Sequence, residues 1–229
     1  MKKKITVVIC SYNNSTYLKK CLKSIFNQSV SSDFFNVILI DDKSDDNSLE
    51  IANIYKKKKN FKIIKNFKNL GLVKSCNKAI NFIKTDFFVR VDSDDYVSKN
   101  FIKFFLKHIK EDNDFILSNY KIFKNNKVRK ININKFRLKN LISCSVAMKT
   151  KIFKQIGGYR NFLWEEYDLY LRYLKKTTKI SRVKHYIYFY RFHKSNMTRL
   201  SSWKIKAWKQ LYKKYKISEI RKLEKLRIS

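Results

Sequence analysis

The sequence predicts an α/β fold with a mostly parallel central sheet and helices on both faces, followed by a basic C-terminal helix. Short β-branched runs alternate with segments of helical spacing through the first half of the 229 residues. Such strand–helix units favour parallel pairing with right-handed crossovers. The hydrophobic fraction of 44% and the chain length are sufficient for one sizeable core.

The first half contains four strand–helix units. Each strand is an apolar run typical of a strand buried on both faces, and each helix carries apolar side chains at intervals of three and four residues. The expected strands span residues 5–10, 35–40, 61–64 and 87–91. Two expected helices span 48–55 and 71–83. A third is capped by Asn14, Ser15 or Thr16 and ends near residue 26, and a fourth is capped by Ser98 and ends near residue 109.

The second half is less regular. Strands or hairpin pieces are expected at 115–118, 120–123, 128–133, 143–148 and 185–192, and a helix at 165–174 after a Gly157-Gly158 turn. From Ser202 onward the sequence predicts one basic helix. We therefore expect a domain over residues 1–200 and a C-terminal addition over 201–229.

The net charge of +35, from 53 basic and 18 acidic side chains, fits two interpretations. A basic surface attracts nucleotide phosphates, nucleic acid or an anionic membrane face. A codon bias towards Lys, Asn, Ile and Phe gives the same composition, and the spread of basic residues along the chain favours this explanation for most of the charge. A basic nucleic-acid-binding protein remains an alternative, although no zinc-finger or RRM signature supports it.

The cysteines and the first residues of the chain indicate the cellular compartment that we expect for this protein. The four cysteines form no CxxC pair and no metal-type spacing with histidine. Cys10 and Cys21 lie in apolar patterns and are expected to be buried thiols, which suits a reducing cytoplasm. The apolar run after Met1 is too short for a signal peptide and is better explained as a first strand. We expect a cytoplasmic protein, with peripheral contact to the inner face of the membrane as an option.

The C-terminal segment allows two arrangements. Trp203, Trp208 and Leu211 among lysines are typical of a helix that lies on an anionic membrane surface. The same residues would serve a helix that packs its aromatic face against the core. The sequence leaves both arrangements open.

Acidic residues are scarce in this chain but gather at two predicted strand ends. Asp41 and Asp42 follow the second strand, and Asp92, Asp94 and Asp95 follow the fourth. Ligands of parallel sheets bind at the carboxyl ends of the strands, so both clusters are expected to face one crevice. Three carboxylates within four residues repel one another unless a cation neutralises them, and Mg²⁺ or Mn²⁺ shared with a diphosphate is the expected cofactor. An acidic turn that caps the next helix is the alternative.

Two further clusters could carry chemistry. Glu165, Glu166 and Asp168 begin a predicted helix, and a carboxylate there could deprotonate an acceptor hydroxyl. Stabilisation of the helix N-terminus explains these acids as simply. Arg191 and His193 follow the last predicted strand, where Arg could pair with a diphosphate and His could ligate a metal or bond a phosphate. A lone histidine after a strand more often has a structural role.

Seven segments in order resemble the inverting glycosyltransferases of family 2, which have the GT-A fold. They are VVICSYN at 7–13, LKSIFNQ at 22–28, DDKSD at 41–45, NLGL at 69–72 followed by NKAI at 77–80, DSDD at 92–95, EEYDL at 165–169 and YRFH at 190–193. Each motif is weak alone, and their order over residues 4–198 carries the resemblance.

The resemblance implies a single displacement in which an acceptor hydroxyl replaces the nucleotide of a nucleotide diphosphate-sugar, expected to be a UDP-sugar. The implied acceptor is a glycan or a lipid-linked glycan in cell-surface polysaccharide or glycolipid synthesis. Asp42 would hold the base, Asp41 or Asp92 would lie near the ribose, and Asp94 with Asp95 would hold the metal. The other implied nucleotide-sugar contacts are Ser11, Tyr12, Asn13, Asn69, Gly71, Lys74, Asn77, Ser93 and Arg191, and His193 joins the metal ligands.

One position departs from the family pattern. The family base is usually the Asp of a Glu-Asp pair, and Glu166 stands at that position. The added methylene moves the carboxylate by about one carbon–carbon bond, and a displacement of ~1 Å can lower a rate ~100-fold. Glu166 in a slightly different pocket, Glu165 or Asp168 as the base, and a weakly active enzyme are the alternatives.

A sugar nucleotidyltransferase would use a similar acidic crevice with a metal. Such enzymes commonly carry a glycine-rich phosphate loop after the first strand. Residues 11–14 of this chain read Ser-Tyr-Asn-Asn and contain no glycine. The sequence therefore favours sugar transfer over nucleotide transfer.

Overall fold

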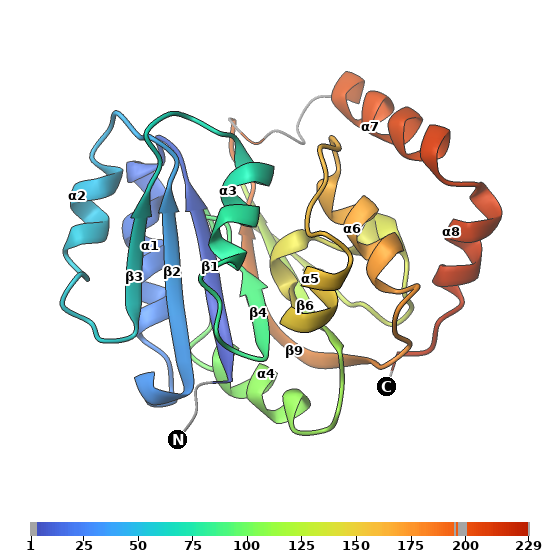
Figure 1. The fold of residues 1–229 in the computed structure, drawn as a ribbon, viewed down its shortest axis with the longest axis horizontal. Helices are drawn as coiled ribbons and strands as arrows, with labels where there is room; N and C mark the ends of the chain where they lie inside the picture. The colour runs from blue at the N-terminus through green and yellow to red at the C-terminus, as the bar shows by residue number, and fades with distance from the viewer. Residues whose placement is uncertain (1–3, 195, 197–200, 229) are drawn as a thin grey trace.

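A nine-stranded sheet crosses the molecule in the order β3-β2-β1-β4-β8-β6-β9-β5, with β7 also paired to β6 (Figure 1). The computed structural model describes residues 4–194, 196 and 201–228. The first four strands are parallel, and β1 lies between β2 and β4. They are β1 (Ile5–Ser11), β2 (Phe35–Asp41), β3 (Phe61–Lys65) and β4 (Phe87–Arg90). The predicted α/β fold is confirmed, with these strand ends within one residue of expectation.

The strands β1 and β2 are buried on both faces because helices cover the sheet from both sides. In Figure 1, α1 lies behind these strands and α3 lies in front of them. The apolar stripe predicted for α1 is buried, and its members are Leu18, Cys21, Leu22 and Ile25. The helices of this half are α1 (Ser15–Phe26), α2 (Ser48–Asn53), α3 (Leu72–Ile80) and α4 (Phe101–Ile109), and η1 (Ser32–Phe34) is a 3₁₀ turn.

Helix α4 begins later than predicted, because its N-cap is Asn100 rather than Ser98. The Ser98 hydroxyl accepts a bond from the Asn100 amide at 3.3 Å, and the Ser98 carbonyl accepts one from Gln28 Nε2 at 2.9 Å. Ser98 therefore closes the turn that precedes the helix. The side chain of Gln28 also reaches the Ile102 amide at 2.9 Å, which satisfies a donor of the first helical turn.

The second half adds antiparallel ladders on the far side of β4. Strand β6 is continuous where two pieces were expected, and a register shift at Asn119 explains the apparent break. The Asn119 side chain bonds the Lys184 carbonyl and the Ile133 amide, at 2.8 and 2.9 Å, where the regular ladder is interrupted. The strands are β5 (Tyr96–Val97), β6 (Phe115–Lys124), β7 (Lys127–Ile131), β8 (Val146–Lys149) and β9 (Ile180–Arg191).

Short helical elements connect these ladders. Residues 143–145, expected as part of a strand, form the 3₁₀ turn η3 immediately before β8. The other elements are η2 (Leu138–Asn140), α5 (Thr150–Gln155) and α6 (Glu165–Tyr173).

The C-terminal segment forms two helices rather than the single predicted helix. They are α7 (Ser201–Lys214) and α8 (Ile217–Glu224), and extended backbone at Lys216 separates them. The aromatic face of α7 packs on the start of α6, with ring centroids of Trp203 and Trp208 at 5.6 and 4.8 Å from that of Trp164. The predicted boundary at residue 200 lies outside the described residues. Among the residues that the structure describes, no helix has the length and apolar character needed to cross a bilayer.

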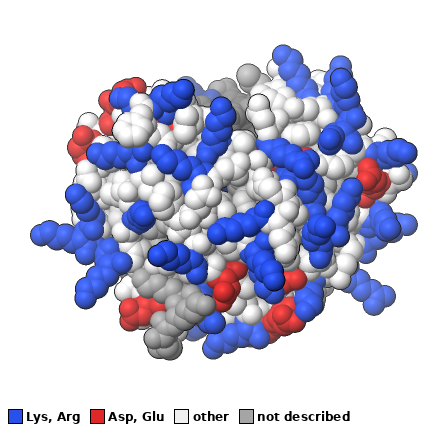
Figure 2. Space-filling model, viewed as in Figure 1, with Lys and Arg blue, Asp and Glu red and all other residues white. Residues whose placement is uncertain are grey.

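Basic side chains are distributed over the visible face of the molecule rather than gathered in one patch (Figure 2). This agrees with their even distribution along the sequence. Clustering on one face, the footprint expected of a protein that tracks a nucleic-acid backbone, is not seen from this side.

The Gly157-Gly158 turn is confirmed, with φ of +76° and +69°. It is held from two sides: Asn77 exchanges two bonds with the Tyr159 backbone, both at 2.9 Å, and Arg172 donates to the Gly158 carbonyl at 2.6 Å. A Cβ at Gly158 would lie 2.6 Å from Asn77 Oδ1, whereas a Cβ at Gly157 would meet nothing within 4 Å.

We expect Gly158→Ala to lower the free energy of unfolding by more than Gly157→Ala. Both substitutions carry the strain of a left-handed conformation, about 1–2 kcal/mol. Gly158→Ala additionally displaces the Asn77 side chain, which should add about 1 kcal/mol for weakened hydrogen bonds. Urea denaturation of the two variants measures the difference. Equal destabilisation would contradict the clamp around Gly158.

Candidate active site

The carboxyl ends of β1, β2 and β4 open into one cleft of about 830 Å³. Its size lies in the range of small-molecule sites. The cleft contains acids from both predicted clusters, so the expectation of one shared crevice is confirmed. The predicted site residues that line it are Ser11, Tyr12, Asp42, Asn69, Gly71, Asp92, Ser93, Asp94, Glu165 and Glu166.

The turn after β4 brings three carboxylates together. One oxygen from each of Asp92, Asp94 and Asp95 lies within 4.8 Å of the others. Asp95 is fully buried and accepts bonds from the Tyr188 hydroxyl at 2.5 Å and from the Arg191 amide at 2.6 Å. Burial, with the charges of Asp94 and Asp92, raises the pKa of Asp95 well above its usual value. Asp95 thus anchors the turn to β9 from behind.

Asp94 faces the cleft and contacts the predicted histidine. Its Oδ2 lies 2.9 Å from His193 Nε2, and the histidine ring stacks on Tyr17 with centroids 4.7 Å apart. Burial and the neighbouring Asp92 raise the pKa of Asp94, although His193 opposes this. Carboxylate oxygens held together against their mutual repulsion suit a hard divalent cation such as Mg²⁺ or Mn²⁺. The donor set therefore fits the metal expected from the sequence.

Asp42 shapes the loop on the opposite side of the cleft. Its Oδ1 accepts bonds from the Leu70 amide at 2.9 Å and from Asn66 Nδ2 at 2.6 Å, and its Oδ2 accepts one from the Gly71 amide at 2.8 Å. Gly71 has φ of +79°, a conformation that glycine adopts without strain. The carboxylate thus fixes the loop that carries Asn69 and Gly71 into the cleft.

Two predicted nucleotide-sugar contacts of this region, Asp41 and Asn13, do not line the cleft. Asp41 is buried and its Oδ2 accepts a bond from the Ser44 amide at 3.3 Å. Asn13 has φ of +46°, and its side chain accepts a bond from the Asp45 amide at 2.8 Å. Both residues support the loop from β2 to α2 and neither lines the cleft.

Four further predicted site residues are also placed outside the cleft. Asn77 clamps the turn around Gly158, and Lys74 is exposed on α3. The Arg191 guanidinium lies over the rings of Tyr17 and Tyr96, with centroids at 4.6 and 5.5 Å, rather than in the cleft. The fourth is Asp168.

Asp168 is a structural residue in this fold, which contradicts its prediction as an alternative base. It is fully buried, and Arg172 Nε and Nη2 contact its Oδ2 at 2.8 and 2.7 Å. The Tyr215 hydroxyl donates to its Oδ1 at 2.6 Å. Both carboxylate oxygens are therefore occupied, and the side chain contacts Tyr215 between α7 and α8 instead of lining the cleft.

The two glutamates at the start of α6 differ in environment. Glu165 is buried and its Oε1 accepts a bond from Arg90 Nη1 at 2.8 Å. Glu166 is half-buried and lines the cleft. Burial and the neighbouring Glu165 raise the pKa of Glu166 well above its usual value. A carboxylate of raised pKa is a better proton acceptor near neutral pH.

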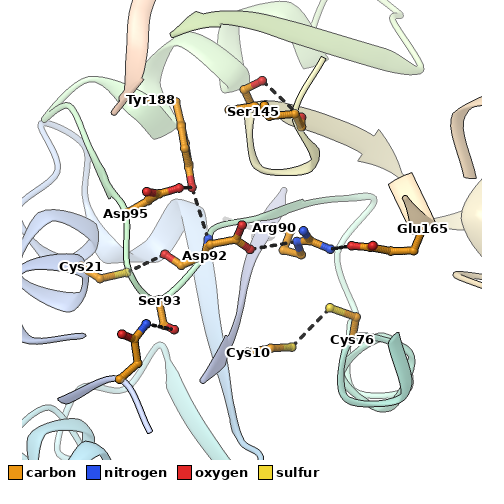
Figure 3. A network of polar contacts seen from close by, with 12 residues as sticks. Cys10, Cys21, Cys76, Arg90, Asp92, Ser93, Asp95, Ser145, Glu165 and Tyr188 are labelled. Carbon is orange, nitrogen blue, oxygen red and sulfur yellow. Dashed lines mark hydrogen bonds and ion pairs between the residues drawn. The ribbon is translucent and has the colours of Figure 1, made fainter. Parts of the chain in front are cut away.

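Sequence reasoning missed Arg90, which lies between the two acidic groups (Figure 3). Its Nε lies 3.1 Å from Asp92 Oδ1, while its Nη1 bonds Glu165. An arginine inside an otherwise apolar strand, two residues before an acidic turn, is the signal that could have found it. A charged side chain is rarely buried without a partner.

Asn14 was also missed, because it was considered only as a helix cap. It is the N-cap position of α1, yet its side chain makes no capping bond. Its Nδ2 instead donates to Ser93 Oγ at 2.7 Å and joins the loop after β1 to the acidic turn. The second asparagine of the Ser-Tyr-Asn-Asn segment therefore belongs to the floor of the cleft.

The cysteines are free thiols. Cys21 is buried as predicted, whereas Cys10 is half-buried and lines the cleft, so its predicted burial is wrong. Its Sγ lies 3.4 Å from Cys76 Sγ (Figure 3). Contact with Cys76, together with burial, raises the pKa of the Cys10 thiol, which keeps it protonated and weakly nucleophilic.

A parallel sheet that carries an acidic turn and a facing glutamate around one cleft is the arrangement of a GT-A glycosyltransferase. The chain belongs to glycosyl transferase family 2, whose family model matches residues 6–167.

Relatives of established name support the assignment. The chain is 41% identical over 96 residues to a poly(ribitol-phosphate) beta-glucosyltransferase of Bacillus spizizenii, a match that covers 41% of this chain and 15% of the relative. It is 32% identical over 117 residues to the putative glycosyltransferase EpsH of Bacillus subtilis, covering 51% of this chain and 33% of EpsH. The chain thus spans a third or less of these two relatives.

The fold matches a solved glycosyltransferase. The structure of Staphylococcus aureus TarS 1–349 in complex with UDP-GlcNAc superposes with a TM-score of 0.76 at 24% identity, over 84% of this chain and 60% of that one. At this identity the match demonstrates the shared fold, and the roles of individual residues rest on the geometry described above.

Proposed function

We propose that this protein transfers a sugar, with inversion, from a nucleotide diphosphate-sugar to an acceptor hydroxyl with the help of a divalent cation. One observation carries the proposal. Asp92 and Asp94 at the end of β4 and Glu166 at the start of α6 line the same cleft. A group that binds a charged leaving group and a group that accepts a proton thus flank one space, as a single displacement requires.

The acidic turn supports the metal part of the proposal. Asp92, Asp94, Asp95 and His193 would hold Mg²⁺ or Mn²⁺, which would supply charge neutralisation for the departing diphosphate. The protein itself keeps these ligands in place: Tyr188 holds Asp95, and Asn14 holds Ser93. These bonds preorganise the turn, so little rearrangement is needed when the donor arrives.

We expect Asp94→Asn to reduce sugar transfer by at least about 100-fold, because loss of one preorganised charge commonly has an effect of this size. EDTA should abolish transfer by the wild-type protein, and added Mn²⁺ or Mg²⁺ should restore it. The matched control is Asp86→Asn, which removes the same charge from an exposed pair with Lys4. Transfer that survives EDTA, or equal losses in both variants, would argue against the metal site.

Glu166 is the proposed base. It lines the cleft together with Glu165, but the Glu165 carboxylate is bonded to Arg90, and Asp168 lies outside the cleft and is bonded to Arg172. Burial and the neighbouring Glu165 raise the pKa of Glu166, which strengthens the affinity of its carboxylate for a proton. As the acceptor oxygen attacks the anomeric carbon, its proton passes to the Glu166 carboxylate, and the nucleotide leaves from the opposite face. One displacement of this kind inverts the anomeric configuration.

We expect Glu166→Gln to lower transfer by about 100- to 10,000-fold, the usual range for loss of a general base. Nucleotide affinity, measured by calorimetry with UDP, should change little, because Glu166 is assigned to the acceptor side. The matched control is Glu111→Gln on the surface, beside His108. Near-normal transfer by Glu166→Gln would overturn its role as base.

The donor and acceptor classes are proposed from the relatives. TarS is solved with UDP-GlcNAc, and the Bacillus spizizenii relative is named for transfer to poly(ribitol-phosphate). We therefore propose a UDP-sugar as donor and a glycan or lipid-linked glycan of the cell surface as acceptor. Thermal stabilisation by a panel of nucleotide sugars with Mn²⁺ would rank the donors directly.

Peripheral membrane contact is proposed for the outer face of α7. Trp203 and Trp208 pack against Trp164 at the start of α6, which is the second of the two arrangements that the sequence leaves open. The flank of α7 beside Trp208 exposes Ile205 and Tyr212, seven residues apart on one side of the helix among exposed lysines, and the Tyr212 ring stacks on that of Trp208 at 5.3 Å. Since Trp203 and Lys204 also line the cleft, a membrane at this face would bring lipid-linked acceptors to its mouth.

We expect the protein to co-sediment with vesicles that contain phosphatidylserine and to remain in solution with neutral phosphatidylcholine vesicles. A variant that combines Lys206→Glu, Lys209→Glu and Lys213→Glu should bind these vesicles at least about tenfold more weakly, since each basic residue near an anionic surface contributes about 1 kcal/mol. The matched control combines Lys56→Glu, Lys57→Glu and Lys59→Glu, which change three lysines that are also exposed and follow α2. Equal weakening by both variants would reject a specific contact through α7.

A further inference from the structure

Arg90 is a buried cation between two carboxylates that come from different parts of the chain. It ends β4, and only 5% of its surface is exposed. Its Nε approaches Asp92 two residues later, while its Nη1 bonds Glu165 at the start of α6 (Figure 3). The Tyr159 ring lies 5.7 Å from its Cζ. A buried guanidinium with two acidic partners stays charged and holds both in fixed positions.

The contact gives the two neighbouring glutamates different roles. Glu165 is 6% exposed, and its Oε1 already accepts a bond from Arg90 Nη1 at 2.8 Å. Glu166 lines the cleft next to this pair, and the charges of both Glu165 and Arg90 act on its carboxylate. Beyond the effect of its own burial, Glu166 therefore has a proton affinity that depends on the ion pair beside it.

We propose that Arg90 is a positioning residue that holds Glu165 as a fixed counter-charge and so assigns proton acceptance to Glu166. This inference rests on the proposed glycosyl transfer. It extends that function, because the same guanidinium links the donor-side aspartate to the acceptor-side helix. Arg90 acts through the two carboxylates that it contacts, those of Asp92 and Glu165.

The charges around Glu166 determine the sign of each expected change. Removal of the Glu165 charge makes the Glu166 carboxylate easier to form, and removal of the Arg90 charge makes it harder. The titratable and charged groups that interact with Glu166 or line the cleft around it are Arg90, Asp92, Arg129, Lys139, Glu165, Tyr167, Tyr170 and Lys204. Arg129, Lys139 and Lys204 are exposed, so solvent screens their effect more strongly.

The test compares the pH dependence of sugar transfer in Glu165→Gln and Arg90→Gln. Transfer needs ionised Glu166, so the rate rises with pH through the pKa of this group. The acid limb is the part of the pH–rate profile in which the rate of transfer rises with pH. We expect this limb to move to lower pH in Glu165→Gln and to higher pH in Arg90→Gln, each by about 1 pH unit. The double variant should return towards the wild-type limb, because both charges are then absent.

A second readout separates the inference from the proposed function. In protein with ¹³C-labelled glutamate side chains, the Glu166 signal is identified by its loss in Glu166→Gln and is titrated in each variant without substrate. Opposite displacements of this titration support the charge assignment even if no acceptor is turned over. Failure of transfer by the wild-type protein would instead overturn the proposed function.

Two variants keep the test decisive. Arg90→Lys retains the charge and should keep the wild-type limb, even with a lower rate from the lost two-sided contact. Glu165→Gln retains an oxygen that can accept the Arg90 bond and is expected to fold. The matched charge control is Lys149→Gln, whose partner Asp114 lies outside the cleft. Displacement in the same direction in Glu165→Gln and Arg90→Gln, or no displacement in Glu165→Gln, would overturn the inference.

Discussion

The site depends on holding several mutually repelling carboxylates close together, with few buried cations nearby to offset their charge. The parallel sheet causes the crowding, since the carboxyl ends of β1, β2 and β4 meet at one edge. Three aspartate oxygens lie within 4.8 Å there, and two glutamates begin α6 on the same cleft. Arg90 is the buried cation that contacts both groups. Its position relieves repulsion within the protein and leaves Asp94 directed towards the cleft.

The many surface lysines do not replace this buried contact. Their charges are hydrated and screened over about 8–10 Å at physiological salt, so they change the electrostatic background more than the state of one carboxylate. The basic residues are spread over the visible face, whereas the acids of the site are gathered by the fold (Figure 2). The extreme net charge and the chemistry of the cleft therefore have separate physical origins.

The parts of the structure that follow local pattern were predictable. Strands with continuous burial, such as β1, and the acidic turns at their ends follow from periodicity and from the topology of parallel sheets. The parts that failed depend on side-chain direction. Successive residues on a helix differ by about 100°, so Asp168 points away from the side that Glu166 presents to the cleft. A motif lists residues in order but does not give the direction in which each one points.

Side-chain contacts between residues far apart in the chain could not be predicted from the sequence either. Arg90 meets Glu165 across 75 residues, and Asn14 meets Ser93 across 79. Neither partner carries a local pattern that identifies the other. The register shift in β6 was hidden for the same reason, because Asn119 bonds chain segments that no periodicity connects to it. Pairings of this kind come from the assembled sheet, not from any single element.

The residue wrongly assigned to catalysis explains how the C-terminal helices belong to the enzyme. Asp168 bonds Tyr215 at the junction of α7 and α8 and Arg172 on its own helix. Arg172 in turn holds the Ile156 and Gly158 carbonyls of the glycine turn. The helix that presents Glu166 is thus fixed at its back by the C-terminal segment and by the turn that precedes it. A buried, fully bonded carboxylate so close to Glu166, the proposed base, would restrain it indirectly, since any rotation of α6 would break the contacts of Asp168 with both neighbours.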